Sequence, residues 1–141
     1  MVKALVPVDG SRNACRAVEH LVSLIQGREP MDVHLLNVQT PIETWEVRSH
    51  LPEAEISAWQ RTRGEEALAS ARAILDTARI PFTAHVLIGD IAPTIARFAE
   101  AQSCQKIVMG TRGMGAIENL ILGSIATKVV HLSKVPITLV R

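Results

Sequence analysis

Residues 2–25 read VKALVPVDGSRNACRAVEHLVSLI, and this stretch decides the fold that we expect for the whole chain. Residues 2–8 form a short, Val-rich apolar run, which is typical of a strand buried on both faces of a parallel sheet. Asp9-Gly10-Ser11 is a turn sequence, and Ser11 suits the N-cap of a helix. Apolar residues then recur at helical spacing, at Ala14, Val18, Leu21 and Ile25. The stretch therefore predicts a strand, a turn and a helix.

The same alternation continues along the rest of the chain. Further apolar runs predict strands at 32–38, 82–88, 105–109 and 136–140, with helical patterns between them. The longest helix is expected to begin near Pro52, because proline suits a first helical turn. Residues 39–51 have no clear period and form a long excursion. Such excursions are often lids, and the sequence does not decide whether this one closes over a site.

Alternating strands and helices predict right-handed crossovers and a parallel sheet covered by helices on both faces. We expect an α/β fold with a five-stranded, doubly wound sheet in the order 3-2-1-4-5. Its 141 residues fit one domain spanning 1–141, since a domain typically has roughly 100–200 residues. Ligands of such sheets bind at the carboxyl ends of the strands, where the winding reverses. The segments 9–11 and 110–113 are expected there.

The composition argues against several classes of function. Lys and Arg number 15 against 14 Asp and Glu, so no large basic face for nucleic acid is expected. Aromatic residues make up only 3%, too few for a surface that stacks bases. No apolar run approaches the ~20 residues of a membrane span, and the N-terminal apolar run is too short for a signal peptide. Two cysteines make no disulfide framework, so a cytoplasmic location is expected.

The segment after the fourth expected strand carries the chemistry. Gly110, Gly113 and Gly123-Ser124 form the pattern G-x2-G-x9-G-S, which ends where the last helix should start. Glycines let a backbone approach a phosphate, and a helix N-terminus adds unpaired N–H donors and a positive dipole end. Ser124 offers a hydroxyl and Arg112 a positive charge. The pattern is suited to a polyphosphate.

These residues make nearly the whole chain resemble the universal stress protein family, in its single-domain, ATP-binding form. The resemblance rests on VPVDGS at 6–11, LLNV at 35–38, MGTRGMGAIENLILGSIATKVV at 109–130 and VPITLV at 135–140. It implies a Rossmann-like fold of the adenine nucleotide alpha hydrolase-like kind. It also implies that ATP binds, with AMP, ADP or cyclic AMP as alternatives.

By the same resemblance, two groups of residues would surround the nucleotide. Those expected around the adenosine, partly through their backbone, are Pro7, Val8, Asp9, Ser11, Val38 and Met109. Those expected to hold the phosphates are Gly110, Arg112, Gly113, Gly123, Ser124 and the backbone of Ile125. A Mg or Mn ion would bridge phosphate oxygens, and no protein ligand is assigned to it.

Simpler explanations stand beside these assignments. Any single glycine is more often just a turn, Arg112 could be a solvated loop charge, and Ser124 could be the N-cap of the last helix. The two tryptophans, Trp45 and Trp59, could fill packing gaps or cover the site. No P-loop or dinucleotide fingerprint is present, and the five histidines show no metal-ligand spacing.

The expected function is that of a nucleotide-dependent sensor or regulator in a stress response. Asp9 is the only candidate acid near the expected site, so any ATP hydrolysis or phosphoryl transfer should be slow. An alternative is an interaction module that regulates a transporter or another protein. The apolar strand near 135–141 lies at an expected sheet edge, which invites pairing with a second copy in a homodimer, and members of the resembling family dimerise in this way.

Overall fold

The computed structural model describes residues 1–111 and 122–141. Its five strands, in chain order, are β1 (Val2–Pro7), β2 (Met31–Gln39), β3 (Phe82–Ile88), β4 (Lys106–Gly110) and β5 (Ile137–Val140). They form one sheet in the order β3-β2-β1-β4-β5, and every neighbouring pair is parallel. The expected fold class and strand order are confirmed, and the expected strand bounds are right to within one or two residues.

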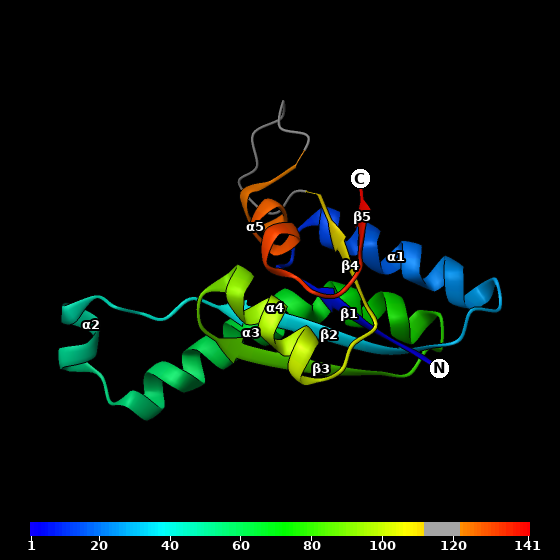
Figure 1. The fold of residues 1–141 in the computed structure, drawn as a ribbon. Coiled ribbons are helices and arrows are strands. Elements are labelled where there is room, and N and C mark those ends of the chain that lie inside the picture. The colour runs from blue at the N-terminus through cyan, green and yellow to red at the C-terminus, as the bar shows by residue number, and fades with distance from the viewer. Residues whose placement is uncertain (112–121) are drawn as a thin grey trace.

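Helices cover both faces of this sheet (Figure 1). The helices α1 (Arg12–Gln26) and α3 (Glu53–Thr77) pack together on one face, and α4 (Ile91–Ala101) and α5 (Ser124–Leu132) pack together on the other. Each face has its own apolar cluster, and alternate residues of β1 supply them: Ala4 and Val6 point into the first, Leu5 into the second. The central strand is thus buried on both faces, which explains its continuous apolar sequence.

The turn after β1 is built as its sequence predicts. Pro7 is the last residue of β1, where the absence of its N–H costs little, and Val8 N then donates to Leu36 O at 2.8 Å. Gly10 has a φ of +87°, a conformation that glycine adopts without steric penalty. Asp9 Oδ1 accepts from Ser11 N at 2.9 Å, and Ser11 Oγ caps α1 by accepting from Ala14 N at 3.2 Å.

The excursion between β2 and α3 contains a short helix that its sequence did not predict, α2 (Trp45–His50). In Figure 1, α2 and the start of α3 extend away from the sheet. Trp45 is 76% exposed and Trp59 is 51% exposed, so neither fills a packing gap. The guanidinium of Arg63 stacks over the Trp59 ring, with its Cζ 5.0 Å from the ring centroid. Within the described ranges, no helix is long and apolar enough to span a membrane.

Candidate functional site

The start of α5 is attached to the end of β4, on the edge of the sheet where the sequence places a site. Thr111 follows β4, and its N–H donates to Val140 O at 2.9 Å while its carbonyl accepts from Gly123 N. Gly123, not Ser124, is the N-cap of α5, and Ser124 is the first helical residue. The N-cap role considered for Ser124 is therefore wrong. Its hydroxyl is not used as the helix cap.

The first turn of α5 offers backbone donors at this edge. The first N–H groups of any helix have no partner within the helix. In α5, Thr127 N donates to Gly123 O at 2.9 Å. Gly123 has no side chain with which to cap them. The donors of Ser124 and Ile125 lie ahead of that bond, so they suit an anion at the positive end of the helix dipole.

An apolar wall lies beside these donors. Val38 and Met109 are 9% and 5% exposed and belong to the cluster between the sheet and α4–α5, and Ile125 packs against the same cluster. These three predicted residues therefore share one face. Val8 belongs to the other cluster, under α1 and α3. The side chain of Val8 therefore lies on the opposite face of the sheet from these three residues.

Asn37 holds the strands together at the same edge, a role that was not predicted from the sequence. Its side chain is 3% exposed, and its Nδ2 donates to Val8 O at 2.8 Å. Gln39 Nε2 in turn donates to Asn37 Oδ1 at 2.7 Å. Asn37 thus fixes the end of β1 against β2, directly before Asp9. A polar residue inside the apolar run 32–38 was the available signal, because buried amides are retained where they are hydrogen-bonded.

Gly110 has a structural role that its place in the glycine pattern did not reveal. A Cβ atom at this position would lie 2.8 Å from the backbone carbon and oxygen of Asn13 in α1. Atoms of a helix backbone cannot move aside as a flexible side chain can, so only glycine allows this approach. Close packing against α1 therefore requires glycine at position 110, whether or not it also contacts a ligand. Arg112 and Gly113 lie outside the described residues.

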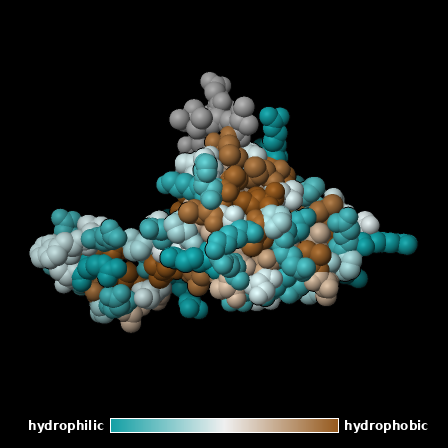
Figure 2. Space-filling view, viewed as in Figure 1, coloured by the Kyte–Doolittle hydropathy of each residue, from teal (hydrophilic) through white to brown (hydrophobic). Residues whose placement is uncertain are grey.

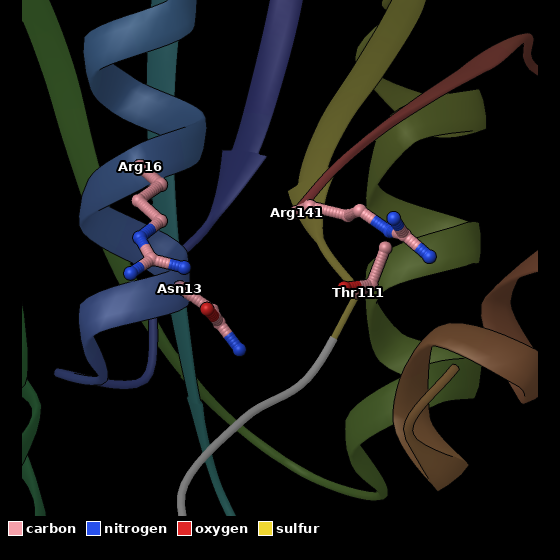
Figure 3. A pocket seen from close by; sticks show the side chains of 4 residues that line it. All are labelled: Asn13, Arg16, Thr111 and Arg141. Atoms are coloured by element: carbon pink, nitrogen blue, oxygen red, sulfur yellow. The ribbon is translucent and has the colours of Figure 1, made fainter. Parts of the chain in front are cut away.

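A polar hollow of about 350 Å³ opens beside this contact, and of its lining residues only Thr111 belongs to a segment that was expected at the site (Figure 3). It lies between the first turns of α1 and the ends of β4 and β5. The lining residues are Asn13, Arg16, Thr111 and Arg141. The sequence did not predict the hollow as a whole, because its residues come from three separate segments that only the sheet order brings together.

The two cysteines do not form a nucleophilic centre. Burial raises the pKa of the Cys15 thiol, and the nearby carboxylates of Glu19 and Asp9 raise it further. Burial also raises the pKa of the Cys104 thiol. Both thiols therefore stay protonated at neutral pH. Across residues 1–111 and 122–141, no three His, Cys, Asp or Glu side chains could together hold a metal ion.

Comparison with known proteins identifies a family and its fold. The model of the Universal stress protein family matches residues 1–141. A universal stress protein of Methanothermobacter thermautotrophicus is 33% identical over 144 residues, covering 99% of this chain and 94% of that protein. The solved structure of the universal stress protein UspA from Lactobacillus plantarum has a TM-score of 0.83 at 20% identity, covering 99% of this chain and 97% of that one.

Two further solved structures contain nucleotides. A universal stress protein in complex with cAMP has a TM-score of 0.72 at 19% identity, covering 99% of this chain and 97% of that one. A universal stress protein family member from Arabidopsis thaliana with AMP bound has a TM-score of 0.70 at 16% identity, covering 99% of this chain and 90% of that one. At these identities the likeness establishes a shared fold.

Proposed function

Because the chain belongs to the universal stress protein family, we propose that it binds an adenine nucleotide at the carboxyl edge of β1, β2 and β4. The observation that carries this proposal is the position of the first turn of α5. Its N–H groups start beside the end of β4, next to the apolar wall of Val38, Met109 and Ile125. Phosphates would take the N–H donors and the dipole end, and the adenosine would lie against the apolar wall.

Within this site, ATP is the proposed ligand. The pattern of Gly110, Gly113 and Gly123-Ser124, with Arg112 inside it, offers donors and a positive charge to several phosphates. A Mg or Mn ion would be held through the phosphate oxygens. The AMP and cAMP in the related structures support an adenine nucleotide in general, and the glycine pattern supports the longer phosphate chain.

The arrangement favours binding over catalysis. Asp9 is the candidate acid, and its Oδ1 already accepts the N–H of Ser11 in the turn that starts α1. A carboxylate engaged in a turn is a poor base for activating water. We therefore propose a cytoplasmic sensor or regulator whose contacts with a protein partner depend on the bound nucleotide. A slow ATPase or phosphoryl-transfer enzyme, or a regulator of a transporter, remains the alternative.

A homodimer through residues 135–141 is part of this proposal. β5 is an edge strand, and Leu139 on it is 40% exposed. Val130 and Leu132 at the end of α5 are 44% and 50% exposed, and Figure 2 shows hydrophobic surface gathered over α5. An apolar edge strand next to exposed apolar side chains favours pairing with a second copy. Two such dimers could associate further into a higher oligomer.

Thermal unfolding of nucleotide-free protein with Mg-ATP, Mg-GTP, AMP and cAMP tests the nucleotide. A ligand at ~100 times its dissociation constant adds about 2.7 kcal/mol to the stability of the folded state. In a domain of this size that raises the melting temperature by several degrees, on the order of 9 °C. We expect the rise with ATP and not with GTP. No rise with any nucleotide would refute the proposal.

Variants locate the site. Gly123→Val and Gly113→Val should lose the ATP-induced rise while remaining folded. Ser124→Ala should weaken ATP binding, whereas Ser57→Ala removes the same hydroxyl from an exposed position of α3 and should leave it unchanged. Normal ATP affinity in both glycine variants would place the nucleotide elsewhere.

A further inference from the structure

We propose that the hollow between α1 and the ends of β4 and β5 is a second binding site, for a phosphate-type oxyanion. It is lined by Asn13 and Arg16 of α1, by Thr111 after β4 and by Arg141 after β5 (Figure 3). These residues are distinct from those proposed to hold the nucleotide. This proposal therefore does not depend on the nucleotide site.

Thr111 is the buried polar group of the hollow. The residue is 8% exposed, and its backbone N–H and carbonyl are both used, by Val140 O and Gly123 N. Figure 3 shows its hydroxyl oxygen on the side that faces α1. A ligand oxygen in the hollow would accept a hydrogen bond from this hydroxyl.

The charge of the hollow is positive. Arg16 and Arg141 line it, and neither forms an ion pair with a carboxylate of the described residues, whereas Arg48 and Arg72 do. Figure 3 shows Arg16 running along α1 toward Asn13. The first turn of α1 contains no acidic residue and contributes the positive end of its helix dipole. The carboxylates of Asp9 and Glu19 lie near Cys15 of the same helix, and the two arginines supply the positive charge of the hollow itself.

Arg141 completes the site from the strand side. In Figure 3 its side chain extends over Thr111 and away from α1. The residue is exposed, and exposed side chains change rotamer within nanoseconds, so the guanidinium can turn into the hollow when an anion is present. In this proposal Arg16 contacts the anion from its present position, and Arg141 contacts it after its side chain has turned.

A phosphate-type dianion matches this set of donors better than a carboxylate does. Two guanidinium forks supply two positive charges and paired N–H groups, which fit the tetrahedral oxygens of a phosphate. The Asn13 amide and the Thr111 hydroxyl add neutral donors for the remaining oxygens. A single carboxylate would leave one guanidinium without a counter-charge. A volume of about 350 Å³ also leaves room for a small group attached to the phosphate.

Gly110 explains why the hollow exists. It lets the end of β4 approach the backbone of Asn13, which brings Thr111 opposite the first turns of α1. A side chain at this position would push the two elements apart and open the hollow toward solvent. The glycine of the sequence pattern therefore shapes this second site directly.

The test is an amide NMR titration of the full chain, free of nucleotide, with inorganic phosphate, ribose 5-phosphate and acetate at matched ionic strength. We expect saturable shifts at Asn13 and Arg16 with both phosphates, and at least tenfold weaker binding of acetate. Tighter binding of ribose 5-phosphate would assign a phosphorylated small molecule, and equal binding would assign the free ion. The absence of saturable shifts at these two residues, or acetate binding as tight as phosphate, would overturn the proposal.

Matched variants separate a built site from a general charge effect. Arg16→Gln should weaken phosphate binding at least tenfold, about 1.4 kcal/mol, and Arg141→Gln should weaken it at least threefold. Arg12→Gln removes the same charge from an exposed position of α1 that does not line the hollow, and should change binding less than twofold. Equal losses in the Arg12 and Arg16 variants would refute the site. ATP affinity should survive Arg16→Gln, so the two proposals can fail separately.

Discussion

His34 Nδ1 and His85 Nε2 lie 3.0 Å apart on neighbouring strands β2 and β3, and their rings are stacked with centroids 5.3 Å apart. The His85 ring also packs against Phe98 of α4, at 4.8 Å between centroids. Asp32 Oδ1 lies 3.2 Å from His34 Nε2. The carboxylate is therefore close to the His34 ring, but the two atoms do not form a hydrogen bond. One ring of the pair must donate and the other accept, so the contact requires at least one neutral imidazole.

This pair makes stability depend on pH. Burial lowers the pKa of His85 below its ordinary value of 6.5, and the nearby positive charges of His34 and Lys3 lower it further. The unfolded chain then binds a proton more readily than the folded one, so stability falls as the pH drops through about 6.5. We expect the free energy of unfolding, from urea titrations, to decrease between pH 7.5 and pH 5.5.

Substitution of His85 tests whether its lowered pKa causes the pH dependence of stability. In His85→Gln the decrease over that interval should be smaller, whereas His50→Gln, on the exposed helix α2, should keep the dependence of the wild type. An unchanged pH profile in His85→Gln would show that the pair is not responsible. Two other charged groups act on the pair: Lys3 lies near His85, and Asp32 lies near His34.

Gly64→Ala should reverse the usual effect of this substitution in a helix. In an exposed helix interior, Ala is more stable than Gly by about 1 kcal/mol. At Gly64 of α3, however, a Cβ atom would overlap Val86 Cγ1 and lie 2.9 Å from Val86 Cγ2. We expect the free energy of unfolding to fall by about 1–3 kcal/mol, as in other overpacked cores. Urea unfolding measures it.

The double variant Gly64→Ala/Val86→Ala provides the control. It removes the methyl groups with which the new Cβ collides, so its destabilisation should be less than the sum of the two single effects, by at least ~0.5 kcal/mol. Additive losses would mean that the space at Val86 is not what requires glycine at this position.

Asn37→Asp should loosen the end of β1. The substitution keeps the side-chain shape and the acceptor for Gln39, but replaces the N–H₂ that donates to Val8 O with an oxygen. A buried carbonyl that loses its donor costs about 1–3 kcal/mol. The melting temperature should fall, and the rise caused by ATP should shrink because Asp9 follows directly.

Gln39→Ala serves as the comparison for Asn37. It removes only the outer hydrogen bond of the pair and leaves the bond from Asn37 to Val8 intact. It should therefore cost less stability than Asn37→Asp and leave the response to ATP unchanged. Similar effects of both variants would indicate that the bond to Val8 has no special role.

Leu139→Asp should disrupt the proposed homodimer. It places a charge on the apolar edge strand β5, where Leu139 is 40% exposed. Ile88→Asp makes the same kind of change on β3, the opposite edge of the sheet, where Ile88 is 47% exposed. Light scattering after size-exclusion chromatography should report monomers for the first variant and dimers for the second. Dimers in both would move the interface away from β5.

The sequence by itself determined the five strands, the longer helices between them and their order. Short apolar runs separated by helical patterns favour a parallel sheet with right-handed crossovers. The turn Asp9-Gly10-Ser11 and the cap on α1 followed from local chemistry alone. Local patterns sufficed because backbone hydrogen bonding and burial of one helix face depend on residues close together in the chain. The glycine pattern similarly marked the edge at which α5 begins.

Only the tertiary structure decided how segments distant in sequence meet. It put Gly110 against the backbone of Asn13, joined Asn37 to Val8, paired His34 with His85, and gathered two arginines around Thr111. None of these relationships has a sequence period, because each joins residues of different elements. They depend on strand order and on packing at distances of a few ångströms, which no single segment of the chain encodes.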